Sequence, residues 1–281
     1  MSQGLTKTKR RIQSVTSTKK ITKAMNLVAT VKLKKWKDNM DNIISYLNVM
    51  EEIISSCVGS VSSESELPEF QKYPNAKGTL YVVVSSTLGL CGGYNYNLFK
   101  FVNRIITKDD KILVIGTKGF SRLSREEFDV DDNYVSFLDK FDYQKVSTLK
   151  DDLLDFYKSG NYKSVKMITT TYKNSLTFIP TEINIFPLEN LTKNESDDSV
   201  IFEPSKKEVI SLIIPKYLET LIYGHLTEAM VCEQASRRNA MDNATDNAEE
   251  LLDKLKIEFN KARQASITQE ITEVVGGSIN K

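Results

Sequence analysis

The amino-acid sequence predicts an α+β protein in which long helices at the two ends of the chain form an antiparallel two-helix coiled coil and flank a central Rossmann-like α/β domain. Residues 5–58 contain neither proline nor glycine, and residues 216–275 contain a single glycine. Between these segments, short apolar runs typical of strands alternate with helical ones. The expected parts are the N-terminal coiled-coil helix 1–58, the central α/β domain 75–203 and the C-terminal coiled-coil helix 205–281.

Helix length supports the coiled coil. A run of about 55 helical residues is roughly 80 Å long, whereas a compact globule of this chain length has a diameter of roughly 50 Å. The two helices therefore cannot be enclosed in one globule. Because they stand at opposite ends of the chain, we expect an antiparallel pair that projects as a rod.

In the first helix, apolar residues recur at alternating steps of four and three, which is the pattern of a heptad seam. The seam residues are Trp36, Met40, Ile43, Leu47, Met50, Ile54 and Cys57. Upstream we expect the same phase to continue through Ile21, Met25 and Val28, with Lys32 interrupting it.

The C-terminal helix is predicted to begin with a capping box formed by Ser205 and Glu208. Pro215 follows inside the helical pattern, and since an interior proline costs about 3 kcal/mol, it predicts a kink or a fresh start. The heptad rhythm then passes through Met241, Ala244, Ala248, Leu251 and Leu255 and, after a slip in phase, through Phe259, Ala262 and Ser266.

The middle of the chain predicts a small, mostly parallel sheet with an antiparallel edge. Polar loops are expected at residues 59–76 and 190–199. The predicted strands are 79–86, 111–117, 165–171 and 176–187, and the predicted helices are 95–107 and 145–158.

Charge is unevenly distributed. The formal net charge is +1, yet no acidic residue precedes Asp38, whereas lysines and arginines are frequent there. This basic helix could bind nucleic acid, lie on an anionic membrane, or face an acidic protein partner or its own partner helix. The last interpretation is favoured because no aromatic side chain precedes Trp36 to stack on bases.

Few residues are suited to catalysis or metal binding. Three scattered cysteines and one histidine predict neither a disulfide framework nor a metal site, and they suit a reducing cytosol. The glycine-rich run at residues 89–93 follows a strand and precedes a helix, but it lacks the spacing of a dinucleotide fingerprint, so a tight structural turn is the default. Residues 116–119 lack the spacing of a phosphate-binding P-loop. No catalytic site is therefore expected on this chain.

The chain end carries an apolar strip of Ile267, Ile271, Val274 and Val275. Chain ends normally fray. An apolar helical end therefore indicates insertion into the sleeve of another protein, although docking on the chain's own body is the alternative.

Four segments carry a family resemblance: residues 19–29 (KKITKAMNLVA), 89–93 (GLCGG), 240–247 (AMDNATDN) and 260–273 (NKARQASITQEITE). Together they resemble the γ subunit of the F-type rotary ATP synthases, over essentially the whole chain. The resemblance implies a non-catalytic central rotor shaft without a cofactor or metal, which couples ion-driven rotation of the membrane ring to conformational cycling of the catalytic β subunits. The implied partners are a hexamer of α and β subunits, the ε subunit and the membrane c-ring, and no nucleic acid. The implied location is peripheral, on the cytoplasmic side of a bacterial cell membrane, with membrane contact only through the complex.

The resemblance also implies contact residues. Met25 would lie beside a lever of a β subunit, and Lys20 and Lys23 would meet acidic lever loops. The residues that would face the hexamer are Arg237, Gln264, Thr268 and Glu270, and those of the apolar bearing are Ile267, Ile271 and Val275.

The resemblance has two departures that matter. The milder one is at the tip, where Ser278 follows the final glycines and the family usually has alanine. The other precedes the glycine-rich run. Thr87 and Leu88 stand where the family commonly has an acidic and a basic residue, which removes the basis for a charged contact at that turn. Three alternatives stay open at this point: a shaft of a paralogous ATPase assembly used for another task such as motility, a nucleic-acid-binding protein with a helical arm, and a Rossmann-like enzyme.

Overall fold

The computed structural model describes residues 3–58, 68–188, 203 and 205–279. The expected loop 190–199 and the first part of the expected loop 59–76 therefore lie outside the described residues. The chain divides into two compact units, one made of residues 1–30 and 237–281, and the other of residues 31–236. Each of the two long helices contributes to both units.

The long helices are continuous. Helix α1 spans Gln3–Val58 with 56 residues, and helix α5 spans Lys206–Ile279 with 74 residues. Pro215 lies inside α5, so of the two outcomes predicted there, a kink or a fresh start, the fresh start is wrong. Its neighbours Ile214 and Leu218 are fully buried in the core of the larger unit. That burial offsets the hydrogen bond that proline removes.

The start of α5 is capped as predicted. The backbone N–H of Glu208 donates to the Ser205 hydroxyl at 3.3 Å, which is the forward half of a capping box.

The α/β domain lies in the larger unit and is built on one five-stranded sheet of order β3-β2-β1-β4-β5. Strands β1 to β4 pair in parallel and β5 pairs antiparallel to β4, so the predicted parallel sheet with an antiparallel edge is confirmed. The strands are β1 Thr79–Val84, β2 Lys111–Ile115, β3 Asp129–Asp131, β4 Ser164–Tyr172 and β5 Phe178–Phe186. The shorter helices are α2 Tyr94–Ile105, α3 Thr117–Leu123, η2 Ser124–Glu126, η3 Phe137–Lys140 and α4 Tyr143–Lys158.

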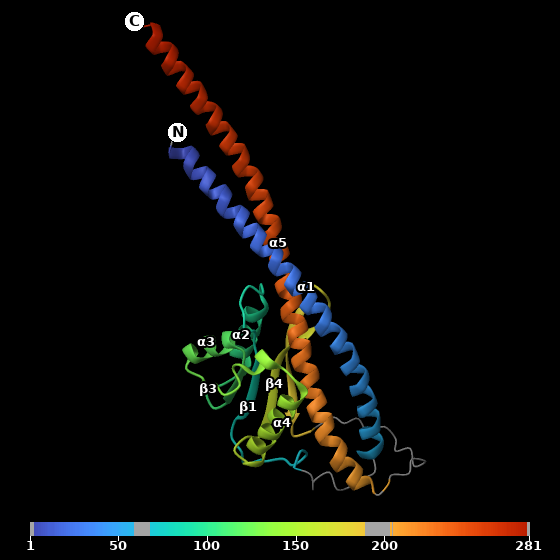
Figure 1. Ribbon diagram of the computed structural model, residues 1–281. Helices are drawn as coiled ribbons and strands as arrows, with labels where there is room; N and C mark the ends of the chain where they lie inside the picture. The colour runs from blue at the N-terminus through green and yellow to red at the C-terminus, as the bar shows by residue number, and fades with distance from the viewer. Residues whose placement is uncertain (1–2, 59–67, 189–202, 204, 280–281) are drawn as a thin grey trace. The chain divides into compact units, whose positions relative to one another are not determined.

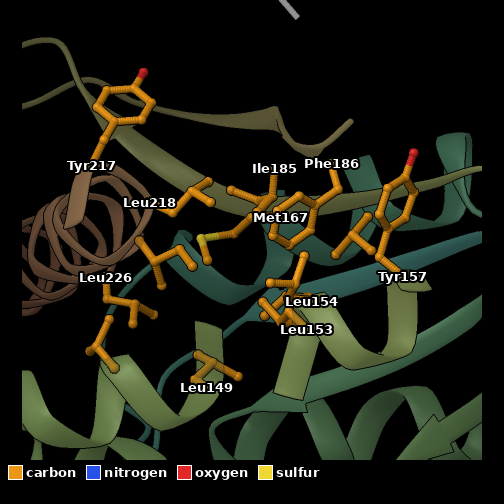
Figure 2. Close-up of a cluster of buried hydrophobic side chains, with 14 of the residues drawn as sticks. Leu149, Leu153, Leu154, Tyr157, Met167, Ile185, Phe186, Tyr217, Leu218 and Leu226 are labelled. Atoms are coloured by element: carbon orange, nitrogen blue, oxygen red, sulfur yellow. The ribbon is translucent and has the colours of Figure 1, made fainter. Parts of the chain in front are cut away.

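Both faces of the sheet are covered. Alternate side chains of a strand point to opposite faces, and in β1 Val82 and Val84 join the core beneath α4 and α5, whereas Tyr81 and Val83 join the core beneath α2 and α3. Figure 2 shows the first of these cores, in which side chains of α4 and α5 meet those of β4 and β5. Its labelled residues are Leu149, Leu153, Leu154, Tyr157, Met167, Ile185, Phe186, Tyr217, Leu218 and Leu226. The lower part of α5 is thus an integral layer of the α/β domain.

In this unit α1 packs on α5 through the predicted seam. Met40, Met50 and Ile54 are buried, which confirms the heptad phase in this part of α1. The helices approach closely at Gly224, where an added Cβ would lie 3.2 Å from Ile43 Cγ2 and 3.4 Å from Leu47 Cδ1. The side chain of the last predicted seam residue, Cys57, lies outside the described ones.

In the smaller unit the predicted phase of α1 is wrong by one position. The side chains of Ile21 and Val28 are 59% and 57% exposed, whereas Thr22 and Ala29 are buried. The seam of this unit instead passes through Ala29, Asn26, Thr22 and Lys19. Because three of these four residues are polar, an apolar pattern could not reveal them.

The predicted seam of α5 needs a similar correction. Leu252 is buried and Leu251 is 38% exposed, so Leu252 is the seam residue. Thr245, which contacts Thr22 of α1, likewise replaces Ala244. With both changes the steps from Met241 to Phe259 alternate regularly between four and three, and the predicted slip in phase disappears.

Candidate partner-contact surface

The seam of the smaller unit is held by polar pairs. Lys19 Nζ lies 2.7 Å from Glu249 Oε1. Asn26 Nδ2 donates to Asp242 Oδ1 at 3.1 Å. These contacts are seven residues apart on each helix and run in opposite directions, which is the register of an antiparallel heptad pair. The basic helix therefore meets its own acidic partner helix at Lys19, in line with the interpretation favoured from sequence.

Between these two pairs lies a hydroxyl contact. The Oγ1 atoms of Thr22 and Thr245 are 2.8 Å apart. Each hydroxyl also lies within hydrogen-bond distance of a carbonyl of its own helix, Thr22 at Lys19 and Thr245 at Met241. The seam is therefore satisfied internally and leaves the other faces of α1 available to other chains.

The outer face of α1 carries the residues expected to meet a partner. Lys20 and Lys23 are exposed, and Met25 is half-buried. Beside them Ile21 and Leu27 are about three-fifths exposed. Sequence reasoning missed this apolar component, because it assigned Ile21 to the seam and passed over Leu27. The correct heptad phase is the signal that would have found it.

Arg237 does not face outward as expected. Its side chain is 6% exposed, so the chain itself covers it. The other candidates on α5 are exposed, namely Gln264, Ile267, Thr268, Glu270, Ile271 and Val275.

The exposed residues lie on an end of α5 that runs beyond its partner helix. Counting back from the Lys19–Glu249 pair, the first described residue of α1, Gln3, lies opposite Ala265. Residues 266–279 of α5 therefore extend about 20 Å past the start of α1, and Figure 1 shows this end of α5 passing the N-terminus.

Polar side chains on this end bond within the helix. Thr268 Oγ1 donates to the Gln264 carbonyl at 3.0 Å, and Ser266 Oγ donates to Glu270 Oε1 at 3.5 Å. Ile267 and Ile271 are 48% and 58% exposed, four residues apart on one face. We call Ile267, Ile271, Val274 and Val275 the apolar strip.

The glycine-rich turn at residues 89–93 is closed by side chains. Asn95 Nδ2 donates to Ser86 Oγ at 2.7 Å, and the Ser86 N–H donates to Asn95 Oδ1 at 3.2 Å. Leu90 and Gly92 have positive φ angles of 61° and 55°, a conformation that favours glycine.

The same turn is docked on α5. The Ser236 hydroxyl donates to the Cys91 carbonyl at 2.7 Å, and the Tyr94 hydroxyl donates to the Ala229 carbonyl at 3.4 Å. Cys91 and Tyr94 pack with Cys232 of α5 in a small buried cluster. The interpretation as a tight structural turn is confirmed, and its role is to attach the sheet to α5. At the departure noted above, Leu88 is 63% exposed.

Within the part of the chain that the structure describes, no three His, Cys, Asp or Glu side chains are grouped to hold a metal ion. The single histidine, His225, lies with Nδ1 3.5 Å from Glu228 Oε2, and Glu228 also accepts the Tyr172 N–H at 2.9 Å. Among the described residues, no helix is long and apolar enough to cross a membrane.

Comparisons with known proteins agree over the full length. A family model described as ATP synthase matches residues 4–279. An ATP synthase gamma chain of Ureaplasma urealyticum serovar 10 is 40% identical over 96% of this chain and 97% of its own. One of Mycoplasma mobile is 37% identical over 98% of each chain.

Two solved structures have a similar fold. The rotor of the Euglena gracilis mitochondrial ATP synthase has a TM-score of 0.66 at 14% identity and covers 94% of this chain and 99% of its own. The central stalk and c-ring of the Tetrahymena thermophila mitochondrial ATP synthase give a TM-score of 0.58 at 25% identity, covering 80% of this chain and 99% of that one.

The chain has a paired-helix seam, an α/β domain built against one of the helices, and an exposed apolar helix end. These features define a shaft-type subunit that works through contacts with other chains. This chain belongs to the ATP synthase γ chain family. It is a non-catalytic central-stalk subunit of an F-type ATP synthase, peripheral within a membrane complex, as the sequence predicted. Family membership displaces the nucleic-acid-binding and Rossmann-enzyme alternatives.

Proposed function

We propose that this γ chain turns inside a hexamer of α and β subunits, with the end of α5 running in an apolar bearing. The observation that carries this proposal is the exposed apolar strip. No described residue of α1 lies opposite this stretch of α5. Apolar contacts are weakly directional, so a sleeve of apolar residues holds such a helix on axis and still lets it rotate. Gln264, Thr268 and Glu270 stand beside the strip and supply polar contacts to the surrounding hexamer.

The outer face of α1 acts as the second contact. Lys20 and Lys23 project from it as exposed cations, next to the half-buried Met25. An acidic lever loop of a β subunit has the complementary charge. Because these cations stand on one face of the helix pair, each orientation of the shaft presents a different surface to each β subunit.

Rotation then works by shifting populations. A shaft orientation changes the conformation of a β subunit only if its contacts differ in free energy between the states that bind, condense and release nucleotide. Of the expected contact residues, the buried Arg237 would take part only after a rearrangement that uncovers it.

The other partners belong to the foot of the stalk. We assign the α/β domain and the adjacent helices to contact with the ε subunit and a membrane ring of c subunits, on the cytoplasmic side of a bacterial cell membrane. The similarity to the Tetrahymena thermophila central stalk and c-ring supports this assignment, as do the bacterial relatives. Contact with the membrane itself would be made only through the complex.

The bearing is tested with single cysteines labelled by an environment-sensitive fluorophore, in a background in which the three native cysteines are replaced by alanine. Ile271→Cys places the label on the apolar strip, and Lys256→Cys places a control label on an exposed position of the same helix. On assembly with α and β subunits, we expect emission from position 271 to shift to the blue and become protected from quenchers. If both positions keep equal quencher access in an assembled complex, the bearing proposal is wrong.

A further inference from the structure

Helix α4 is joined to α5 by a buried ionic cluster. The Glu219 side chain on α5 is 3% exposed. Its Oε1 lies 2.7 Å from Ser147 Oγ and 3.4 Å from Lys150 Nζ, and both of those residues belong to α4. Its Oε2 lies 2.8 Å from Lys216 Nζ on its own helix. Both carboxylate oxygens are therefore satisfied, one by the α/β domain and one by α5.

The α4 side of the cluster is also well held. Lys150 is buried, and its ammonium lies 2.7 Å from Asp151 Oδ1 as well as near Glu219. In the ion pair of Lys150 with Glu219 both side chains are almost fully buried. Sequence reasoning missed it because the two residues are far apart along the chain.

Stability alone is a poor explanation for this cluster. Removing two charges from water is costly, and apolar side chains of similar volume are often as stabilising or more so. The ionic contact is directional, because its hydrogen bonds form only at one relative position of α4 and α5. The surrounding α4–α5 core consists of apolar side chains, both aliphatic and aromatic (Figure 2), and the hydrophobic attraction between them is non-directional.

An aromatic group lies at the same end of α4. Phe141 stacks on Tyr223 of α5 with ring centroids 4.9 Å apart, and it also meets Trp36 of α1 at 5.7 Å. Tyr143 packs edge-on against Tyr223 at 5.7 Å. Phe141, just before α4, thus contacts both shaft helices, and Tyr143 in the first turn of α4 contacts α5. The Glu219 cluster holds α4 to α5 a short way further along the same helix.

We propose that Glu219, with Lys150 and Ser147, is the joint through which torque passes between the α/β domain and the shaft. This inference rests on the proposed rotor function. When the membrane ring turns the α/β domain, the load reaches α5 as shear across the α4–α5 contact. The directional bonds to Glu219 oppose that shear, and the docking of the turn 89–93 on Ser236 gives a second point of attachment.

The test uses the assembled membrane complex in inverted vesicles. ATP hydrolysis is measured beside the membrane potential that it generates, followed with an oxonol dye so that the result does not depend on the transported ion. One variant is Glu219→Gln. The other is the double variant Lys150→Met with Glu219→Leu, and this double variant keeps the core filled while it removes the directional bonds. The control is Glu182→Gln, which breaks the Lys166–Glu182 pair between β4 and β5.

We expect both joint variants to hydrolyse ATP near the wild-type rate while the potential generated per ATP falls by about threefold or more, as a slipped state becomes populated. Glu182→Gln should keep wild-type coupling. An assembled double variant with unchanged coupling would overturn the proposal, and this holds even if Glu219→Gln fails to assemble. Failure of the rotor function itself would look different, because the unmodified chain would then be missing from the ATPase complex.

Discussion

Asn26 of α1 donates its side-chain amide both to the Arg238 carbonyl, at 3.3 Å, and to the Asp242 carboxylate of α5, at 3.1 Å. It occupies a heptad position that most coiled coils fill with an apolar side chain. A polar residue at such a position sets helix register at some cost in stability.

Asn26→Ala should weaken the helix pair of the smaller unit by about 1 kcal/mol, because two interhelical hydrogen bonds are lost while Asp242 stays hydrated. Hydrogen exchange of α1 and α5 amides in that unit measures the change. Thr18→Ala is the control, since the exposed Thr18 hydroxyl bonds only within its own helix, to the Ser14 carbonyl. Equal effects of the two substitutions would contradict an interhelical role for Asn26.

The Thr22–Thr245 contact predicts strong non-additivity. Either threonine changed alone to valine leaves the other, at least half-buried hydroxyl with one partner fewer and should cost about 0.5–1.5 kcal/mol. Changing both to valine replaces the contact with an apolar one and should be nearly neutral. A double-mutant cycle followed by thermal unfolding gives the coupling free energy. Additive effects would show that the two hydroxyls do not interact.

Substitution of Gly224 has two opposing effects on stability, one from helix propensity and one from crowding between α1 and α5. Alanine gains about 1 kcal/mol of helix propensity, but its Cβ requires Ile43 to give way by a few tenths of an ångström. We therefore expect Gly224→Ala to be close to neutral in thermal unfolding. Gly224→Val should destabilise by about 1–3 kcal/mol through overpacking. A stabilised valine variant would mean that α1 and α5 are not in close contact here.

Glu219 should make the stability of the α/β domain depend on pH. Burial of its carboxyl opposes ionisation, but hydrogen bonds led by those of Lys216 and Ser147 outweigh it and lower the pKa from 4.5 to about 2. A lowered pKa means that the stabilisation is complete above pH 4.5 and is lost as the pH falls from there towards 2.

Comparison with Glu219→Gln isolates this contribution. At neutral pH the variant should be less stable by about 1–3 kcal/mol, since a neutral amide replaces the charged acceptor of the Lys216 and Lys150 hydrogen bonds, while Lys150 keeps its pair with Asp151. Urea unfolding at a series of pH values should show this difference shrinking below pH 4.5. A difference that stays constant down to pH 2 would rule out the lowered pKa as its cause.

Sequence alone predicted those features that depend on apolar pattern. The α1 seam around Met40 and Met50 and the sheet with its antiparallel edge follow from burial of large apolar side chains, and the structure has both. The seam around Thr22 and Asn26 escaped prediction because its specificity lies in hydrogen bonds, which leave no apolar period.

Other features depend on tertiary context. The three-residue strand β3 is too short for a pattern to show and exists through its pairing with β2. The burial of Arg237 and the pairing of Lys150 with Glu219 require knowledge of which distant segments meet. Pro215 lies in a continuous helix because its neighbours are buried. Helix propensity alone takes no account of that burial.

The end of α5 that passes the start of α1 has a thermodynamic consequence. Chain ends that nothing ties down fray, and residues 266–279 are kept helical only by propagation from the rest of α5 before the subunits come together. Part of the association free energy must go into freezing this segment. Substitutions there that raise helix propensity without touching the apolar strip should therefore speed or tighten assembly, although they add no contact with any neighbouring chain.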